Sequence, residues 1–135
     1  MRAGKLPQAQ ARAEQYLATK PRDAQMQFLL GTIQQSAGKT AEALVIFTKM
    51  VEDFPELPEP YNNLAVIYAA QNQYDKARTA LEMAIRTKPD YTIAHENLGD
   101  VYAKLASQHY GKALSLDTAN NGVALKLATV RDLFA

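Results

Sequence analysis

The 135-residue sequence contains no cysteine and no tryptophan, and only six glycines and six prolines. The lack of cysteine excludes disulfide bonds, a thiol nucleophile, and zinc or iron–sulfur sites built on cysteine. Fifteen Lys and Arg against fourteen Asp and Glu leave a net charge of +1, which argues against a dedicated nucleic-acid-binding domain because such domains are strongly basic. No stretch approaches the roughly 20 apolar residues of a membrane-spanning helix. With 47% hydrophobic residues, the composition is that of one folded domain.

Leucines, prolines and small residues recur at a fixed spacing of 34 residues. Further apolar residues between them follow helical intervals of three and four. The columns are Pro21, Pro55 and Pro89; Leu30, Leu64 and Leu98; Gly31, Ala65 and Gly99; Ala9, Ala43 and Ala77; and Gly4 and Gly38. A fixed period of this size indicates a repeat architecture in which each unit is one small supersecondary element.

Each 34-residue unit contains two helical stripes separated by a short turn, SAGKT in one unit and QNQYD in the next. Gly38 and Asn72 are placed where such a turn needs a left-handed residue. Pro55 and Pro89 stop each second helix, because the residue before proline disfavours helical backbone. Each unit is therefore predicted to form two helices of about 14 residues, joined by a tight turn.

These columns resemble the tetratricopeptide repeat, whose pattern has a large residue at position 4, Leu at 7, small residues at 8, 20 and 27, aromatics at 11 and 24, and Pro at 32. The second unit matches with Tyr61, Leu64, Ala65, Tyr68, Ala77, Ala84 and Pro89, while the first departs at Gln27, Gln34 and Met50. The resemblance implies an all-α fold, a right-handed α-solenoid of antiparallel helix pairs. It divides one domain, 1–135, into a half repeat (4–23), repeat 1 (24–57), repeat 2 (58–91), a shortened repeat 3 (92–120) and a C-terminal capping helix (121–135).

The chain begins in the middle of a repeat, since the segment before Ala24 matches only a second helix. We therefore expect a fragment of a longer protein, and the family resemblance implies a bacterial one. Any export signal or membrane anchor would lie upstream, which leaves both cytoplasm and periplasm open.

The third repeat is irregular because its second-helix columns arrive five residues early. The stretch between Asp100 and Tyr110 has no proline and no turn cluster, which predicts one continuous helix from about 93 to 116, roughly 35 Å long. The alternative is a very tight turn around residues 106–108. In a continuous helix the second half cannot fold back on the first, so its apolar face would need another partner, and a second chain could supply it as a homodimer. That face holds Leu105, Ala106, Tyr110, Ala113 and Leu114.

The sequence offers no set of residues that enzyme chemistry would need. His95 and His109 are fourteen residues apart, and phosphate-binding glycine loops and nucleophile-elbow motifs are missing. We expect His95, at repeat position 4, to pack against the neighbouring helix. The chain is thus predicted to be non-catalytic, with no cofactor and no metal.

The family resemblance implies protein binding on a concave face that is lined by the first helix of each repeat. The candidate partner-binding residues carried over from the family's contact positions are Phe28, Thr32, Gln35, Glu59, Asn62, Asn63, Val66, Glu96, Asn97, Asp100 and Lys104. Chaperone-binding relatives hold a C-terminal carboxylate there with Lys, Arg and Asn, whereas this face carries three carboxylates and one lysine. We therefore expect the groove to bind a neutral or basic partner segment, extended or helical, with Asn63 and Asn97 available to a peptide backbone.

Overall fold

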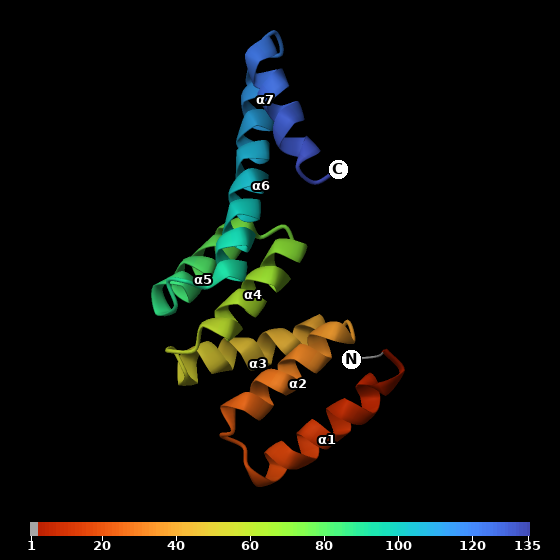
Figure 1. The fold of residues 1–135 in the computed structure, drawn as a ribbon. Coiled ribbons are helices and arrows are strands. Elements are labelled where there is room, and N and C mark those ends of the chain that lie inside the picture. The colour runs from red at the N-terminus through yellow and green to blue at the C-terminus, as the bar shows by residue number, and fades with distance from the viewer. Residues whose placement is uncertain (1–2) are drawn as a thin grey trace.

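The computed structural model describes residues 3–135; Met1 and Arg2, at the start of the predicted domain, lie outside the described residues. These described residues form seven α-helices and no strand, so the all-α prediction is confirmed. In Figure 1 the helices stack into an elongated α-solenoid that is extended at one end by a long helix. The elements are η1 (Ala3–Lys5), α1 (Leu6–Thr19), α2 (Ala24–Ser36), α3 (Thr40–Asp53), α4 (Pro58–Ala70), α5 (Tyr74–Thr87), α6 (Thr92–Leu116) and α7 (Asn121–Asp132). None of the helices formed by residues 3–135 is both long and apolar enough to cross a bilayer.

A left-handed residue makes each tight turn between paired helices. Gly38 follows α2 with a φ of 78°, and Asn72 follows α4 with a φ of 60°. In both turns the next backbone N–H donates to the carbonyl five residues before it, at 2.8 Å. The predicted turns are confirmed, and they close α2–α3 and α4–α5 as packed pairs (Figure 1).

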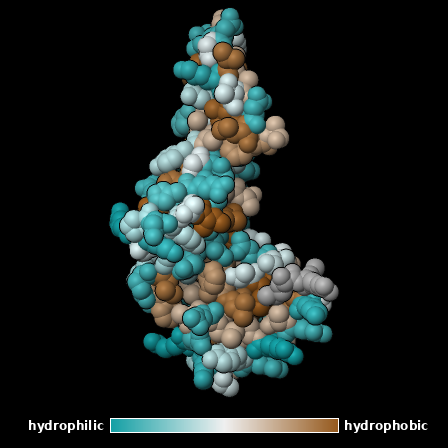
Figure 2. All heavy atoms as spheres, viewed as in Figure 1, coloured by the Kyte–Doolittle hydropathy of each residue, from teal (hydrophilic) through white to brown (hydrophobic). Residues whose placement is uncertain are grey.

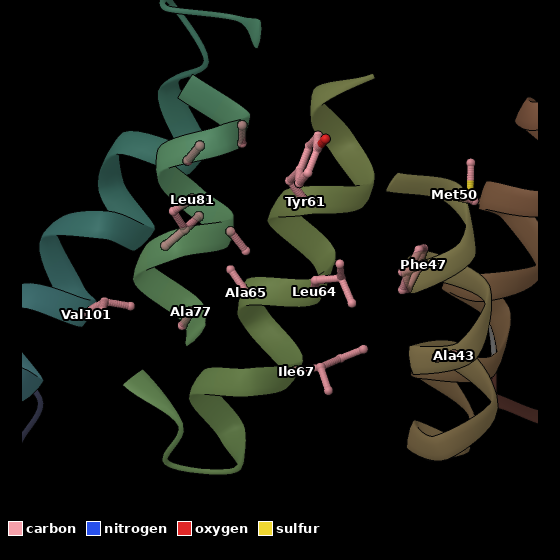
Figure 3. Close-up of a cluster of buried hydrophobic side chains, with 13 residues drawn as sticks. Ala43, Phe47, Met50, Tyr61, Leu64, Ala65, Ile67, Ala77, Leu81 and Val101 are labelled. Carbon is pink, nitrogen blue, oxygen red and sulfur yellow. The ribbon is translucent and has the colours of Figure 1, made fainter. Parts of the chain in front are cut away.

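Small residues on the first helix of a pair face large residues on the second. At Gly31 a Cβ atom would lie 2.7 Å from the ring of Phe47, which is completely buried. In repeat 2 the same two columns hold Ala65 and Leu81, which belong to the main core cluster (Figure 3). The glycine therefore accompanies the larger side chain and the alanine the smaller one.

The three residues at repeat position 4 each make an equivalent hydrogen bond, although their side chains are of different types. Tyr61 Oη donates to the carbonyl of Pro55 at 3.2 Å, and Gln27 Nε2 donates to that of Pro21 at 2.6 Å. His95 Nε2 lies 2.8 Å from the corresponding carbonyl of Pro89. His95 is exposed, so the expectation that it packs against the neighbouring helix is wrong. What the column preserves is a donor that ties each first helix to the preceding proline.

The third repeat forms one continuous 25-residue helix, α6, as predicted. Its first half packs on α5, its second half extends beyond the body, and α7 runs back along it (Figure 1). The five residues expected to need a partner, Leu105, Ala106, Tyr110, Ala113 and Leu114, are all half-buried. The chain's own α7 thus supplies part of the cover that we expected from elsewhere.

We predict that Gly31→Ala lowers the free energy of unfolding by about 1–3 kcal/mol, because the added methyl overpacks the ring of Phe47. The double variant Gly31→Ala with Phe47→Leu recreates the pair of repeat 2 and is expected to recover most of this loss. Urea denaturation of the three proteins makes the comparison. A Gly31→Ala protein as stable as wild type would contradict the packing described for this pair.

Candidate functional site

The predicted partner-binding residues come from α2, α4 and α6, the first helices of the three repeats. Four of them hold these helices together through side-chain amides. Asn97 Nδ2 donates to Asn62 Oδ1 at 3.0 Å, which joins α6 to α4. Asn63 Nδ2 donates to Gln35 Oε1 at 3.3 Å, which joins α4 to α2. Because Asn62 is only 6% exposed, its amide is part of the scaffold and is not available to a ligand.

A hollow of about 460 Å³ lies between α4 and α6. Four predicted residues line it: Val66, Asn97, Asp100 and Lys104. Its floor is apolar, with Ala65, Ala69, Leu81 and Val101, and Asn72, Tyr74, Ala70 and Phe134 complete the lining. Figure 2 shows hydrophobic residues gathered at this junction of α4 and α6. Val66, 43% exposed, is an apolar side chain that solvent reaches at this hollow.

Phe134 is a lining residue that sequence reasoning missed. The Nζ of Lys104 lies 4.0 Å from the centre of its ring, a cation–π contact that directs the ammonium at the aromatic face. Phe134 lies just after α7, in a segment that the repeat pattern treats only as a cap. The signal for its position is the length of α6, which carries α7 outward and brings the end of α7 back toward residue 104.

A second hollow of about 400 Å³ lies where α2 and α4 begin, and Phe28 and Glu59 line it together with Pro60, Leu57, Met50, Ala24 and Gln25. The ring of Phe28 also packs against Phe47, with 5.7 Å between ring centres, so much of Phe28 belongs to the core. Burial raises the pKa of the nearby Tyr91, and the charge of Glu59 raises it further. The predicted partner-binding residues that line a hollow are therefore divided between two separate hollows.

Thr32 and Glu96 line neither hollow. The hydroxyl of Thr32 donates to the carbonyl of Phe28 at 2.9 Å within α2, and Glu96 is exposed on α6. Between residues 3 and 135 no three His, Asp or Glu side chains are grouped as metal ligands. The arrangement is thus one of apolar hollows with polar rims, which suits the binding of side chains.

Comparison with known proteins places this geometry in a family. Family models described as tetratricopeptide repeat match residues 34–105 and 1–58. A curated relative is the chloroplastic tetratricopeptide repeat domain-containing protein PYG7 of Arabidopsis thaliana, 38% identical over 53% of this chain and 25% of its own length. The chain spans a quarter or less of the curated relatives it matches.

Two solved structures show the same fold at low sequence identity. A thermophilic tetratricopeptide repeat protein of Thermus thermophilus is 23% identical, with a TM-score of 0.71 over 98% of this chain and 76% of the other. The first tetratricopeptide repeat domain of Spaghetti (RPAP3), bound to the HSP90 peptide SRMEEVD, is 22% identical, with a TM-score of 0.61 over 84% and 94%.

The two amide bonds differ in burial, which gives a matched test. Asn97→Ala leaves the buried Oδ1 of Asn62 without its donor, and we expect the free energy of unfolding to fall by about 1–3 kcal/mol. Asn63→Ala, in the same repeat column, leaves only the half-buried Gln35, so a smaller loss is expected. Equal losses in chemical denaturation would show that the Asn62–Asn97 bond is no scaffold element.

Proposed function

The chain belongs to the tetratricopeptide repeat family, and from that premise we propose that the hollow between α4 and α6 binds a neutral or basic segment of a partner protein. Tetratricopeptide repeats are protein–protein interaction modules. The observation that carries the proposal is the hollow itself, which has a volume of about 460 Å³, an apolar floor and a polar rim. Sites of this build bind apolar side chains and fix their orientation with a few polar groups.

The rim favours a basic neighbour for the inserted side chain. Asp100 lines the hollow and makes no ion pair with any residue of the described chain. The only cation of the rim, Lys104, is turned toward the ring of Phe134. A Lys or Arg next to the inserted side chain would therefore find an unpaired carboxylate, and an acidic ligand would meet repulsion.

The comparison with the RPAP3 domain sharpens this expectation. That domain is bound to SRMEEVD, a peptide rich in carboxylates. At the family's contact positions this chain carries Glu59, Glu96 and Asp100. We therefore expect SRMEEVD not to bind this chain. The peptide can serve as a negative control, because the domain that it is bound to has the same fold.

Self-association through α6 is a second candidate function. The specific observation in its favour is the incomplete burial of the second half of α6, which extends beyond the body alongside α7 (Figure 1). Its apolar residues are only half-buried, and Leu116 and Leu125 nearby are 76% and 70% exposed.

A random peptide library displayed on phage and selected on the immobilised chain tests the groove. We expect enrichment of sequences that combine Lys or Arg with an aliphatic or aromatic residue. Asp100→Lys, alone and with Glu96→Lys, should weaken a selected peptide at least about tenfold, or 1.4 kcal/mol, with little change in melting temperature. Glu52→Lys, the same charge change at an exposed site on α3, is the control and should leave binding unchanged. Selected peptides that bind Asp100→Lys as tightly as wild type, or clear binding of SRMEEVD, would contradict the proposal.

A further inference from the structure

The second half of α6 corresponds to the second helix of repeats 1 and 2. It is less completely buried than those two helices are. Positions 20, 24 and 27 are completely buried in both of those repeats, whereas in repeat 3 they are half-buried. The buried residues are Ala43, Phe47 and Met50, then Ala77, Leu81 and Ala84; their half-buried counterparts are Ala106, Tyr110 and Ala113. What these three lack is the first helix of their own repeat.

The first half of α6 corresponds to the first helix of repeats 1 and 2. The positions that face the second helix in those repeats are exposed here. In repeat 2, Tyr61 and Ala65 at positions 4 and 8 are 7% and 1% exposed. In repeat 3, His95 and Gly99 are both exposed, and nothing lies within 4 Å of the place where a Cβ of Gly99 would be. Tyr102, at position 11, is 49% exposed. No second helix of the same repeat packs on this face.

Helix α7 does not fill either place. It packs through Val123, Leu127 and Val130, which occupy positions 3, 7 and 10 of a following repeat. In repeat 2 those same positions, Pro60, Leu64 and Ile67, are also buried. Helix α7 therefore covers α6 as the first helix of the next repeat would, and the contact within repeat 3 stays unmade.

The residues of these two incompletely covered surfaces of α6 match each other. In repeat 1 a glycine at position 8 faces an aromatic ring at position 24, and in repeat 2 these positions hold an alanine and a leucine of the same core cluster. Repeat 3 has the first combination, Gly99 with Tyr110. On one continuous helix these residues are eleven positions apart, about 16 Å along the axis, so they cannot touch within one chain.

We propose that a second copy of this chain supplies the missing contact, in a two-fold dimer whose α6 helices lie antiparallel. This rests on the self-association proposed above and specifies its geometry. The first half of each α6 packs on the second half of the other, and Gly99 of one copy receives the ring of Tyr110 of the other. Each contact then repeats by symmetry, as in an isologous interface, and each copy completes the other's third repeat.

The proposed dimer leaves the partner hollow accessible. Residues 97, 100 and 104 line that hollow, whereas the dimer uses residues 95, 99 and 102 of the same helix half. The two functions can therefore be removed independently by substitution.

A disulfide experiment reads this geometry directly, because the chain has no native cysteine. Gly99→Cys and Tyr110→Cys are combined in one full chain, which is oxidised and analysed by non-reducing electrophoresis. Facing residues lie within the Cα distance of about 4.4–6.8 Å that a disulfide needs, so we expect a covalent dimer of twice 14.9 kDa. The two single variants are the controls and should cross-link far less. A monomer with an internal disulfide, or no disulfide, would overturn the proposal.

A complementary variant keeps the tyrosine in place. Gly99→Arg puts a bulky charge where nothing lies within 4 Å in the single chain, so the fold should persist while the dimer is lost. Thr79→Arg, at an exposed site on α5, is the control and should remain dimeric. Light scattering of the wild-type chain distinguishes the two proposals. A monomer at high micromolar concentration would contradict self-association itself. A wild-type dimer that Gly99→Arg does not weaken would contradict only the antiparallel arrangement of α6.

Discussion

The helix pairs α2–α3 and α4–α5 each close through one residue that takes a left-handed backbone conformation. Gly38 and Asn72 do this at φ of 78° and 60°, and the chain reverses direction at both. A residue with φ above zero is costly for most side chains, so the reversal depends on having glycine or asparagine at that place. In repeat 3 the five positions that hold the turn are missing, and Leu105 directly follows Lys104. With good helix formers on both sides, continuing the helix is the conformation of lower energy.

The shape of the C-terminal half follows from that one missing turn. The second half of α6 extends beyond the body and carries α7 with it (Figure 1). Helix α7 still packs as the first helix of a following repeat, and its end returns to place Phe134 over Lys104. The hollow between α4 and α6 thereby gains an aromatic wall. The same missing turn leaves α6 exposed at residues 95, 99 and 102 and only half-covered at residues 106, 110 and 113, so the groove and the proposed dimer have one structural origin.

The repeat columns predicted the helices, their turns and the fused α6, because helix periodicity, proline and left-handed residues act locally. Side-chain roles that depend on contacts between repeats were less accessible. Asn62, Asn63, Asn97 and Gln35 were expected to face a ligand, but they bond one another across neighbouring helices. Phe134 is 30 residues from Lys104, and no local pattern links the two. His95 shows a third case, in which the column preserves a hydrogen-bond donor to a proline carbonyl and not a hydrophobic volume.

The central claim, that repeat 3 is one continuous helix, can be tested by a single distance. Thr92 and Ser115 are exposed and lie near the two ends of α6, and a chain without native cysteine can be spin-labelled at these two sites alone. Doubly labelled chains diluted into an excess of unlabelled chains report the distance within one molecule by pulsed electron paramagnetic resonance. The continuous helix predicts about 35 Å, at 1.5 Å per residue. A distance near the 8–10 Å spacing of paired helices would mean that α6 folds back, and would contradict the account.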